Sequence, residues 1–137
     1  ASLSVKQYEG DLFISIAGTV GKPIISKIKC CIHDGFVWFP KLKINKEFLY
    51  YIFSGGEVYK GLGKLGTQLN LNTDTIGNIV LPIPNQNEID TIVEYLDNKT
   101  SKIDTLLQKI EKQIELLKEK KTVLISNAVT GKIDVSN

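Results

Sequence analysis

The last third of the chain contains a long stretch, residues 100–128, that no proline or glycine interrupts. Within it, apolar residues and one lysine recur at alternating steps of four and three. This series is Ile103, Leu107, Ile110, Ile114, Leu117, Lys121, Leu124 and Ala128. A heptad seam of this kind is typical of a helix that packs against another long helix. Roughly 28 residues rising 1.5 Å each give a rod of about 42 Å, so we expect part of the seam to find a partner.

The partner predicted by this seam is a second copy of the chain. Because the sequence contains one such helix, pairing would give a homodimer with two-fold symmetry. Lys121 at a core position lowers the stability of the pair but can fix its register or orientation. Ahead of the rod, residues 86–96 predict a separate short helix. We expect a break near residues 97–99, with Thr100 or Ser101 capping the long helix.

Composition predicts a soluble, cytoplasmic protein with no membrane partner. The 137 residues are 42% hydrophobic, which suffices for one compact domain plus the rod. No signal peptide is evident, and no apolar run approaches the roughly 18 residues of a membrane span. Cys30 and Cys31 are adjacent, and with a single histidine they suit neither a disulfide nor a zinc site. They predict reduced cysteines in a strand or in the core.

Residues 1–84 predict a small mixed head, which makes the whole chain α+β. Alternating apolar residues and turn signals predict four strands and one helix, followed at residues 79–83 by a further short strand or an extended exit. The strands are expected at residues 12–17, 23–26, 29–33 and 35–39, and the helix at 46–53. Phe36, Trp38 and Phe39 are expected to form the aromatic core. The histidine, His33, stands beside an Asp-Gly turn and is expected to be structural.

Two glycine-rich segments of the head are candidates for ligand contact. Residues 18–21 form a turn between two strands, and they lack the Gly-Lys-Ser/Thr ending and following helix of a P-loop. Residues 61–78 form a long loop with several amide side chains and flanking lysines. Amide side chains can read adenine edges and lysines can bind phosphates, but such a loop can equally serve only to close the domain.

The sequence carries no recognisable catalytic chemistry. It has no paired carboxylates, no cofactor fingerprint, no Walker sequence and no metal-ligand cluster. All 17 basic residues are lysines and the net charge is +2, which fits a nucleic-acid partner and an ordinary lysine surface alike. We therefore expect no enzymatic activity and no cofactor on this chain.

Four stretches carry a resemblance to a known family. They are GDLFISIAGTVGK at residues 10–22, GTQLNLN at 66–72, LPIPNQNEIDTIVEYLD at 81–97 and KIDTLLQKIEKQIELLKEKKTVLISNAVTGKID at 102–134. Together they resemble the C-terminal part of the specificity subunit of a type I restriction–modification system. One departure is Ile89, which stands after Glu88 where the family usually has Gln.

The resemblance implies a division into a target recognition domain, residues 1–84, lacking its N-terminal part, and a helical spacer and dimerisation region, residues 85–137. In this family each recognition domain reads one half of a bipartite double-stranded DNA target, and two conserved helices pair antiparallel to space the half-sites. A rod of about 42 Å suits a spacing of about one DNA turn, 34–36 Å. Modification subunits, which bind S-adenosylmethionine, dock on the helices, and a restriction (motor) subunit joins them.

On this basis DNA contact is expected from two loops of the head. The expected residues are Thr19, Lys22, Lys60, Lys64, Thr67, Gln68, Asn70 and Asn72. Two alternatives stay open. One is a coiled-coil assembly protein whose head binds protein. The other is the specificity part of a single-chain restriction–methylation enzyme, with its catalytic residues outside this chain.

Overall fold

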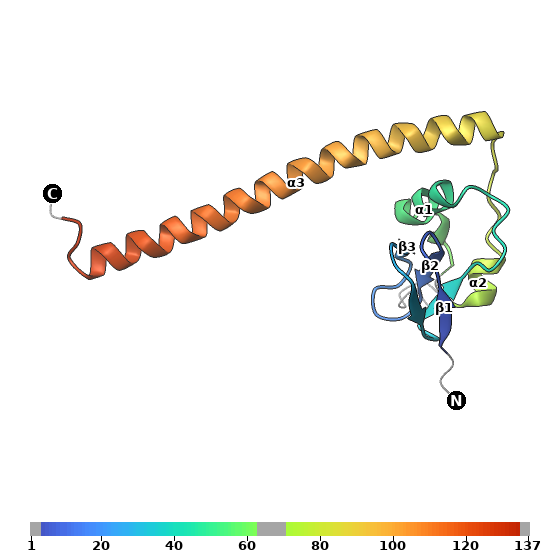
Figure 1. The fold of residues 1–137 in the computed structure, drawn as a ribbon, viewed down its shortest axis with the longest axis horizontal. Coiled ribbons are helices and arrows are strands. Elements are labelled where there is room, and N and C mark those ends of the chain that lie inside the picture. Colours follow the sequence, from blue (N-terminus) through green and yellow to red (C-terminus); the bar gives the residue numbers. More distant parts are fainter. Residues whose placement is uncertain (1–3, 63–70, 135–137) are drawn as a thin grey trace. The chain divides into compact units, whose positions relative to one another are not determined.

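A computed structural model of the chain describes residues 4–62 and 71–134, and it has the α+β architecture expected from the sequence (Figure 1). The strands are β1 (Val5–Gln7), β2 (Leu12–Ser15), β3 (Pro23–Ile25), β4 (Cys30–Ile32) and β5 (Phe36–Trp38). The helices are α1 (Lys46–Gly55), the 3-10 turn η1 (Glu57–Tyr59), α2 (Thr73–Gly77) and α3 (Gln86–Val129).

The strands form two small antiparallel sheets. One has the order β3-β2-β5 and the other pairs β1 with β4. In the larger sheet the central strand β2 places Phe13 opposite Trp38 and Ile14 opposite Val37. All four residues of β2 are buried, as expected for a central strand that is covered on both faces.

One face of the larger sheet packs on the helices of the head. Ile14, which is 0% exposed, belongs to a buried cluster with residues from β5, α1 and α2. The members of this cluster are Leu12, Ile14, Val37, Leu49, Phe53, Leu71 and Ile76. Leu12, Ile14 and Val37 share a face because side chains alternate along a strand and cross-strand neighbours point the same way.

The opposite face of the same sheet carries aromatic side chains. The Phe13 and Phe36 rings meet edge to face with centroids 5.4 Å apart, and the His33 ring lies 5.2 Å from Phe36. His33 Nδ1 also accepts the Gly35 N–H at 2.9 Å. Its ring therefore holds the turn between β4 and β5 as well as packing on the sheet, which agrees with the structural role predicted for it.

The predicted aromatic core is wrong for Trp38. Phe39 does stack on the buried Phe53, with ring centroids 6.1 Å apart. Trp38 is 38% exposed instead, because in the three-residue strand β5 it is Val37 that faces the helices. Because side chains alternate along a strand, Trp38 points to the aromatic face of the sheet.

The helix α1 is defined by caps at both ends. Asn45 Oδ1 accepts the Phe48 N–H at 2.8 Å, which satisfies one of the free donors of the first turn. Gly56 ends the helix with φ +74°, and its N–H donates to Phe53 O at 3.2 Å. This left-handed conformation is accessible to glycine without a Cβ penalty. It redirects the chain into η1.

The break predicted near residues 97–99 is wrong. A single helix, α3, runs for 44 residues from Gln86 to Val129. Thr100, expected as a cap, lies within the helix and its hydroxyl donates to Leu96 O at 2.8 Å. The polar residues at the expected break have only modest helix penalties, and without proline or glycine they do not stop the helix.

The start of α3 is fixed by a reciprocal cap. Asn85 Oδ1 accepts the Glu88 N–H at 3.0 Å, and Glu88 Oε2 accepts the Asn85 N–H at 3.2 Å. This is the capping-box arrangement, which satisfies two backbone donors at once. Glu88 therefore has a structural role as the second partner of this cap, which requires a residue three positions after Asn85.

The chain divides into two compact units, the first ending at Glu94 and the second beginning at Tyr95. Ile89, on the first turn of α3, is buried within the first unit. The domain boundary predicted between residues 84 and 85 stays a prediction. It coincides with the start of α3 and not with the limit of the first unit. Cys30 and Cys31 lie on β4 as free thiols.

Candidate nucleic-acid interface

The turn between β2 and β3 presents Thr19 and Lys22, both of which are exposed. It is built around Ser15, whose backbone O accepts the Gly21 N–H at 2.7 Å. The Ser15 hydroxyl donates to Thr19 O and accepts the Lys22 N–H at 3.3 Å. We call residues 18–22 the hairpin turn. The side chain that organises it is buried, so the turn is a defined structure and not a loose loop.

Tyr59 also holds the hairpin turn in place. Its hydroxyl donates to Gly21 O at 2.9 Å. Gly21 has φ +84°, and a Cβ there would lie 2.9 Å from Cε2 of the Tyr59 ring. Burial raises the pKa of the Tyr59 hydroxyl to about 12, because the phenolate would be poorly solvated. The donor therefore stays protonated throughout the physiological range.

Lys60 follows Tyr59 directly and is exposed. Its Nζ lies 2.7 Å from Glu57 Oε2, and both side chains are 75% exposed. A surface ion pair of this kind is worth little, so the ammonium group can exchange it for a phosphate. The turn and Lys60 come from different parts of the sequence, and Tyr59 connects them.

Asn72 has a structural task in this region. Its Oδ1 accepts the Thr75 N–H at 2.7 Å and the Thr75 hydroxyl at 2.9 Å, which caps α2. The amide oxygen that could read a base is thus occupied, and base contact by Asn72 stays a prediction. The remaining four candidates, Lys64, Thr67, Gln68 and Asn70, lie outside the described residues.

Sequence reasoning missed a second exposed surface of the head. Tyr8 and Trp38 are both exposed, and with Lys6, Gln7 and Asp11 they line a cavity of about 250 Å³. We call this the Trp38 surface. The ammonium group of Lys29 lies 5.6 Å from the centroid of the Tyr8 ring. The alternation of Phe36, Val37 and Trp38 was the available signal, because it allows only the middle residue to share a face with the helical core.

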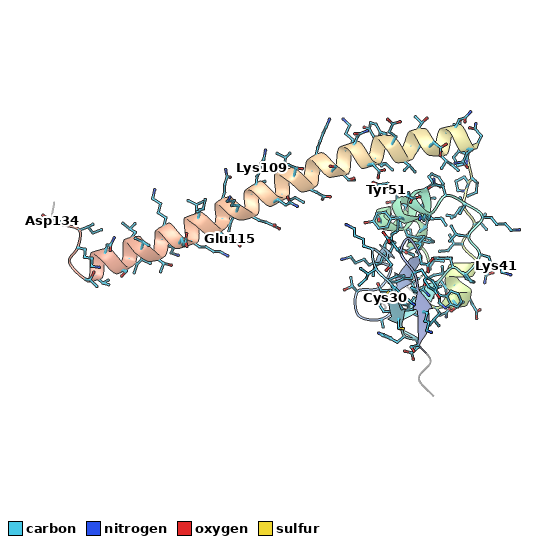
Figure 2. All side chains as sticks on the ribbon, in the orientation of Figure 1. Cys30, Lys41, Tyr51, Lys109, Glu115 and Asp134 are labelled. Carbon is cyan, nitrogen blue, oxygen red and sulfur yellow. The ribbon has the colours of Figure 1, made fainter. Side chains whose placement is uncertain are left out.

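The predicted seam lies along α3, and its members from Ile103 to Leu124 are exposed. Its large apolar members are 46% to 66% exposed within the chain. Figure 2 shows Lys109 and Glu115 projecting from the helix; both lie off the seam by their heptad positions. Contiguous exposed apolar residues of this kind mark an interaction surface. The seam positions are thus available for pairing, although pairing itself stays a prediction.

Within residues 4–62 and 71–134, no group of three or more His, Cys, Asp or Glu side chains is placed to hold a metal ion. In the same ranges, no helix combines the length and the hydrophobicity needed to cross a bilayer. The head presents exposed lysine and hydroxyl side chains on the hairpin turn, and exposed aromatic side chains on the Trp38 surface.

Comparison with known families identifies the chain. A family model described as the type I restriction modification DNA specificity domain matches residues 4–116. The chain belongs to this family. The match runs from the first strand of the head to the middle of the seam, so the resemblance inferred from the sequence is confirmed.

A solved structure supports the same assignment at the level of fold. A chain from a type I R-M system, whose study concerned complex assembly and conformational transition, matches with a TM-score of 0.72 at 23% identity. The match covers 90% of the present chain and 31% of the other. The present chain therefore spans about a third of the length of that relative.

Proposed function

We propose that the chain is a non-catalytic specificity component of a type I restriction–modification complex, and that its head reads one half of a bipartite DNA target. The observation that carries the proposal is the match of a DNA specificity family to the head and to the first half of the seam. The hairpin turn and Lys60 would contact DNA, with lysines on phosphates. Residues 66–72 would supply base contacts.

The test of the DNA proposal is a salt titration of lysine variants. Lys22→Ala and Lys60→Ala should each weaken binding to all duplexes alike. Each should also lower the slope of log K against log salt by about 0.9, the value for one lost phosphate contact. Lys41→Ala is the matched control, because this exposed lysine lies in the segment between β5 and α1. Slopes that equal the unmodified protein's in both test variants would refute the assignment of the interface.

A second candidate function is favoured by the Trp38 surface. Exposed Trp and Tyr side chains beside a cavity are typical of protein–protein contacts. The chain would then be a coiled-coil assembly protein whose head binds protein. Salt-independent binding to a protein partner, lost in Trp38→Ala but kept in Lys22→Ala, would favour this function over DNA reading.

The seam would pair with the same helix of a second copy, or with a second copy of the conserved region in a longer chain. Lys121 favours the antiparallel orientation in a homodimer. In a parallel, in-register pair Lys121 would face Lys121 of the other copy at the core, where two like charges are costly. In an antiparallel pair the core layers join unlike positions, so Lys121 can face an apolar residue instead.

Charges beside the seam select one antiparallel register. With Ile114 facing Leu117 of the second copy, Glu111 lies beside Lys118 of that copy on both sides of the two-fold axis. A shift by one heptad brings Glu111 against Glu111 in one direction and Lys118 against Lys118 in the other. Each exposed ion pair contributes only about 0.2–1 kcal/mol. The favoured register has two such pairs and no like-charged contact among these residues, whereas each shifted register contains one like-charged contact, offset in the first case by Asp104 beside Lys118. In the favoured register Lys121 faces Ile110, next to Glu111 of the second copy.

Charge reversal tests this register. Glu111→Lys and Lys118→Glu should each weaken dimerisation, because each creates two like-charged contacts. The double variant should restore it. Sedimentation equilibrium at low salt provides the dissociation constants. If the double variant loses as much dimerisation free energy as the two single variants lose together, this register is ruled out.

The remaining roles would belong to partners. Modification subunits carrying S-adenosylmethionine would dock on the helical region and methylate adenine, and a restriction subunit with motor activity would join the assembly in the cytoplasm. Co-sedimentation of the chain with a modification subunit tests the docking. A Leu117→Asp variant that fails to dimerise but still binds modification subunits would separate the two uses of the helix.

A further inference from the structure

Two of the segments proposed to contact DNA, the hairpin turn and the segment that carries Lys60, are far apart in the sequence. Both are contacted by one residue, Tyr59. Tyr59 lies 38 positions after Gly21 and donates its hydroxyl proton to Gly21 O at 2.9 Å. Its own backbone O accepts the Leu62 N–H at 3.2 Å, at the start of the long loop. One side chain therefore touches the hairpin turn while its backbone supports the segment that carries Lys60.

Tyr59 is itself anchored on the core of the head. Its ring stacks on Phe53 with centroids 5.9 Å apart and an interplanar angle of 21°. Phe53 is buried and belongs to the core cluster on α1. The backbone N–H of Tyr59 donates to Gly56 O at 3.1 Å, just after the left-handed end of α1. Its ring position is thus set by α1, independently of the hairpin turn.

We infer that Tyr59 is a positioning residue that locks the hairpin turn to the segment carrying Lys60, so that the two present one preorganised surface to DNA. This inference rests on the proposed DNA-reading function. A turn held by two hydrogen-bonded side chains loses less conformational freedom on binding, which increases affinity without a new contact. Tyr59 would therefore act on affinity while touching no nucleotide.

The position of the Tyr59 ring also requires glycine at residue 21. The closest ring atoms would lie 2.9 Å to 3.4 Å from a Cβ at this position, so alanine would force the Tyr59 ring away. Gly18, in the same turn, also has positive φ, +70°, yet a Cβ there would meet nothing within 4 Å. Alanine at either position brings the same kind of backbone strain, and only at Gly21 does it also displace the ring.

The first experiment measures, in the absence of DNA, how far Tyr59 stabilises the hairpin turn. Tyr59→Phe removes the hydroxyl but keeps the ring that stacks on Phe53. Amide hydrogen exchange at residues 18–22 should accelerate by roughly threefold to tenfold, the equivalent of one hydrogen bond. Tyr95→Phe, on an exposed ring of α3, should leave this exchange unchanged. Unchanged exchange in Tyr59→Phe would overturn the inference.

The second experiment measures the effect on DNA at a temperature where all variants are folded. Tyr59→Phe should weaken duplex binding by roughly threefold to tenfold with the salt slope unchanged, since no phosphate contact is removed. Gly21→Ala should weaken it more than Gly18→Ala. If Lys22→Ala lowers the salt slope but Tyr59→Phe binds DNA as the unmodified protein does, the lock is refuted while the DNA-reading function stands. If Lys22→Ala and Lys60→Ala also have no effect, the DNA-reading function itself fails.

Discussion

Two adjacent leucines on α3 provide a sharp test of the seam. Leu117 belongs to the heptad series, whereas Leu116 lies one residue earlier and off the seam. Within the chain they are 66% and 55% exposed, respectively. Leu117→Ala and Leu116→Ala remove the same atoms from the same helix and have the same effect on helix propensity. They differ only in the face of the helix that is changed.

The expected effect of Leu117→Ala follows from its exposure. Fully burying a leucine side chain is worth about 1.5–3 kcal/mol, so covering the exposed two-thirds, and allowing for the Cβ that alanine keeps, is worth about 1–1.5 kcal/mol. A two-fold dimer contains the residue twice, which gives about 2–3 kcal/mol per dimer. Since about 1.4 kcal/mol is tenfold, the dissociation constant should rise roughly 30-fold to 150-fold.

Sedimentation equilibrium across a wide concentration range provides these constants. Leu116→Ala should remain close to the unmodified protein. Circular dichroism on both variants controls for loss of helix. Equal dimerisation of the two variants would mean that the seam does not form the pair, whatever the strength of association.

Further predictions concern the head and can be checked by urea unfolding. Ile14→Ala should lower the free energy of unfolding by about 2–5 kcal/mol, because Ile14 is fully buried in the core cluster. Asn45→Ala should lower it by about 1 kcal/mol through loss of the cap on Phe48. Stability should fall as pH rises from 10 to 12, because the Tyr59 pKa is raised from 10.0 to about 12 in the folded state. The ceiling is about 2.7 kcal/mol, which solvent screening of the partly exposed ring reduces to about 1 kcal/mol. Tyr59→Phe should lack this part of the pH dependence, and equal curves for the two proteins would contradict it.

The features that the sequence predicted well are those with a short repeat. The heptad of residues 103–128 has a period that belongs to one kind of helix, and these residues do lie within the single helix α3. The hairpin turn was also predicted, because alternating apolar residues flank two glycines. Local pattern sufficed in both cases.

The break that the sequence predicted near residues 97–99, and that α3 lacks, shows how local preference misleads. Residues 97–99 include an Asp and an Asn, which suggested a helix end and a cap at Thr100. Threonine can bond either to the backbone ahead of it or to the turn behind it, and here its hydroxyl donates to Leu96 O. The helix on both sides overrides the weak preference of these few residues.

The contact between Tyr59 and Gly21 could not be predicted. It joins residues 38 positions apart, and its geometry depends on how α1 and η1 pack on the sheet. Asn72 is a different case, because Asn followed by a short helical stretch is a recognisable N-cap signal. The amide pattern of its loop drew attention to base reading instead.

Selection of DNA targets by the assembled complex tests the central claim most directly. The chain would be combined with a modification subunit and used to select sequences from a random duplex pool. A two-fold dimer with one reading head per copy predicts enrichment of an inverted repeat, with half-sites separated by about one DNA turn, 34–36 Å. The Lys22→Ala and Tyr59→Phe variants should weaken this enrichment. Recovery of no sequence, or of the sequence selected by the modification subunit alone, would contradict the account.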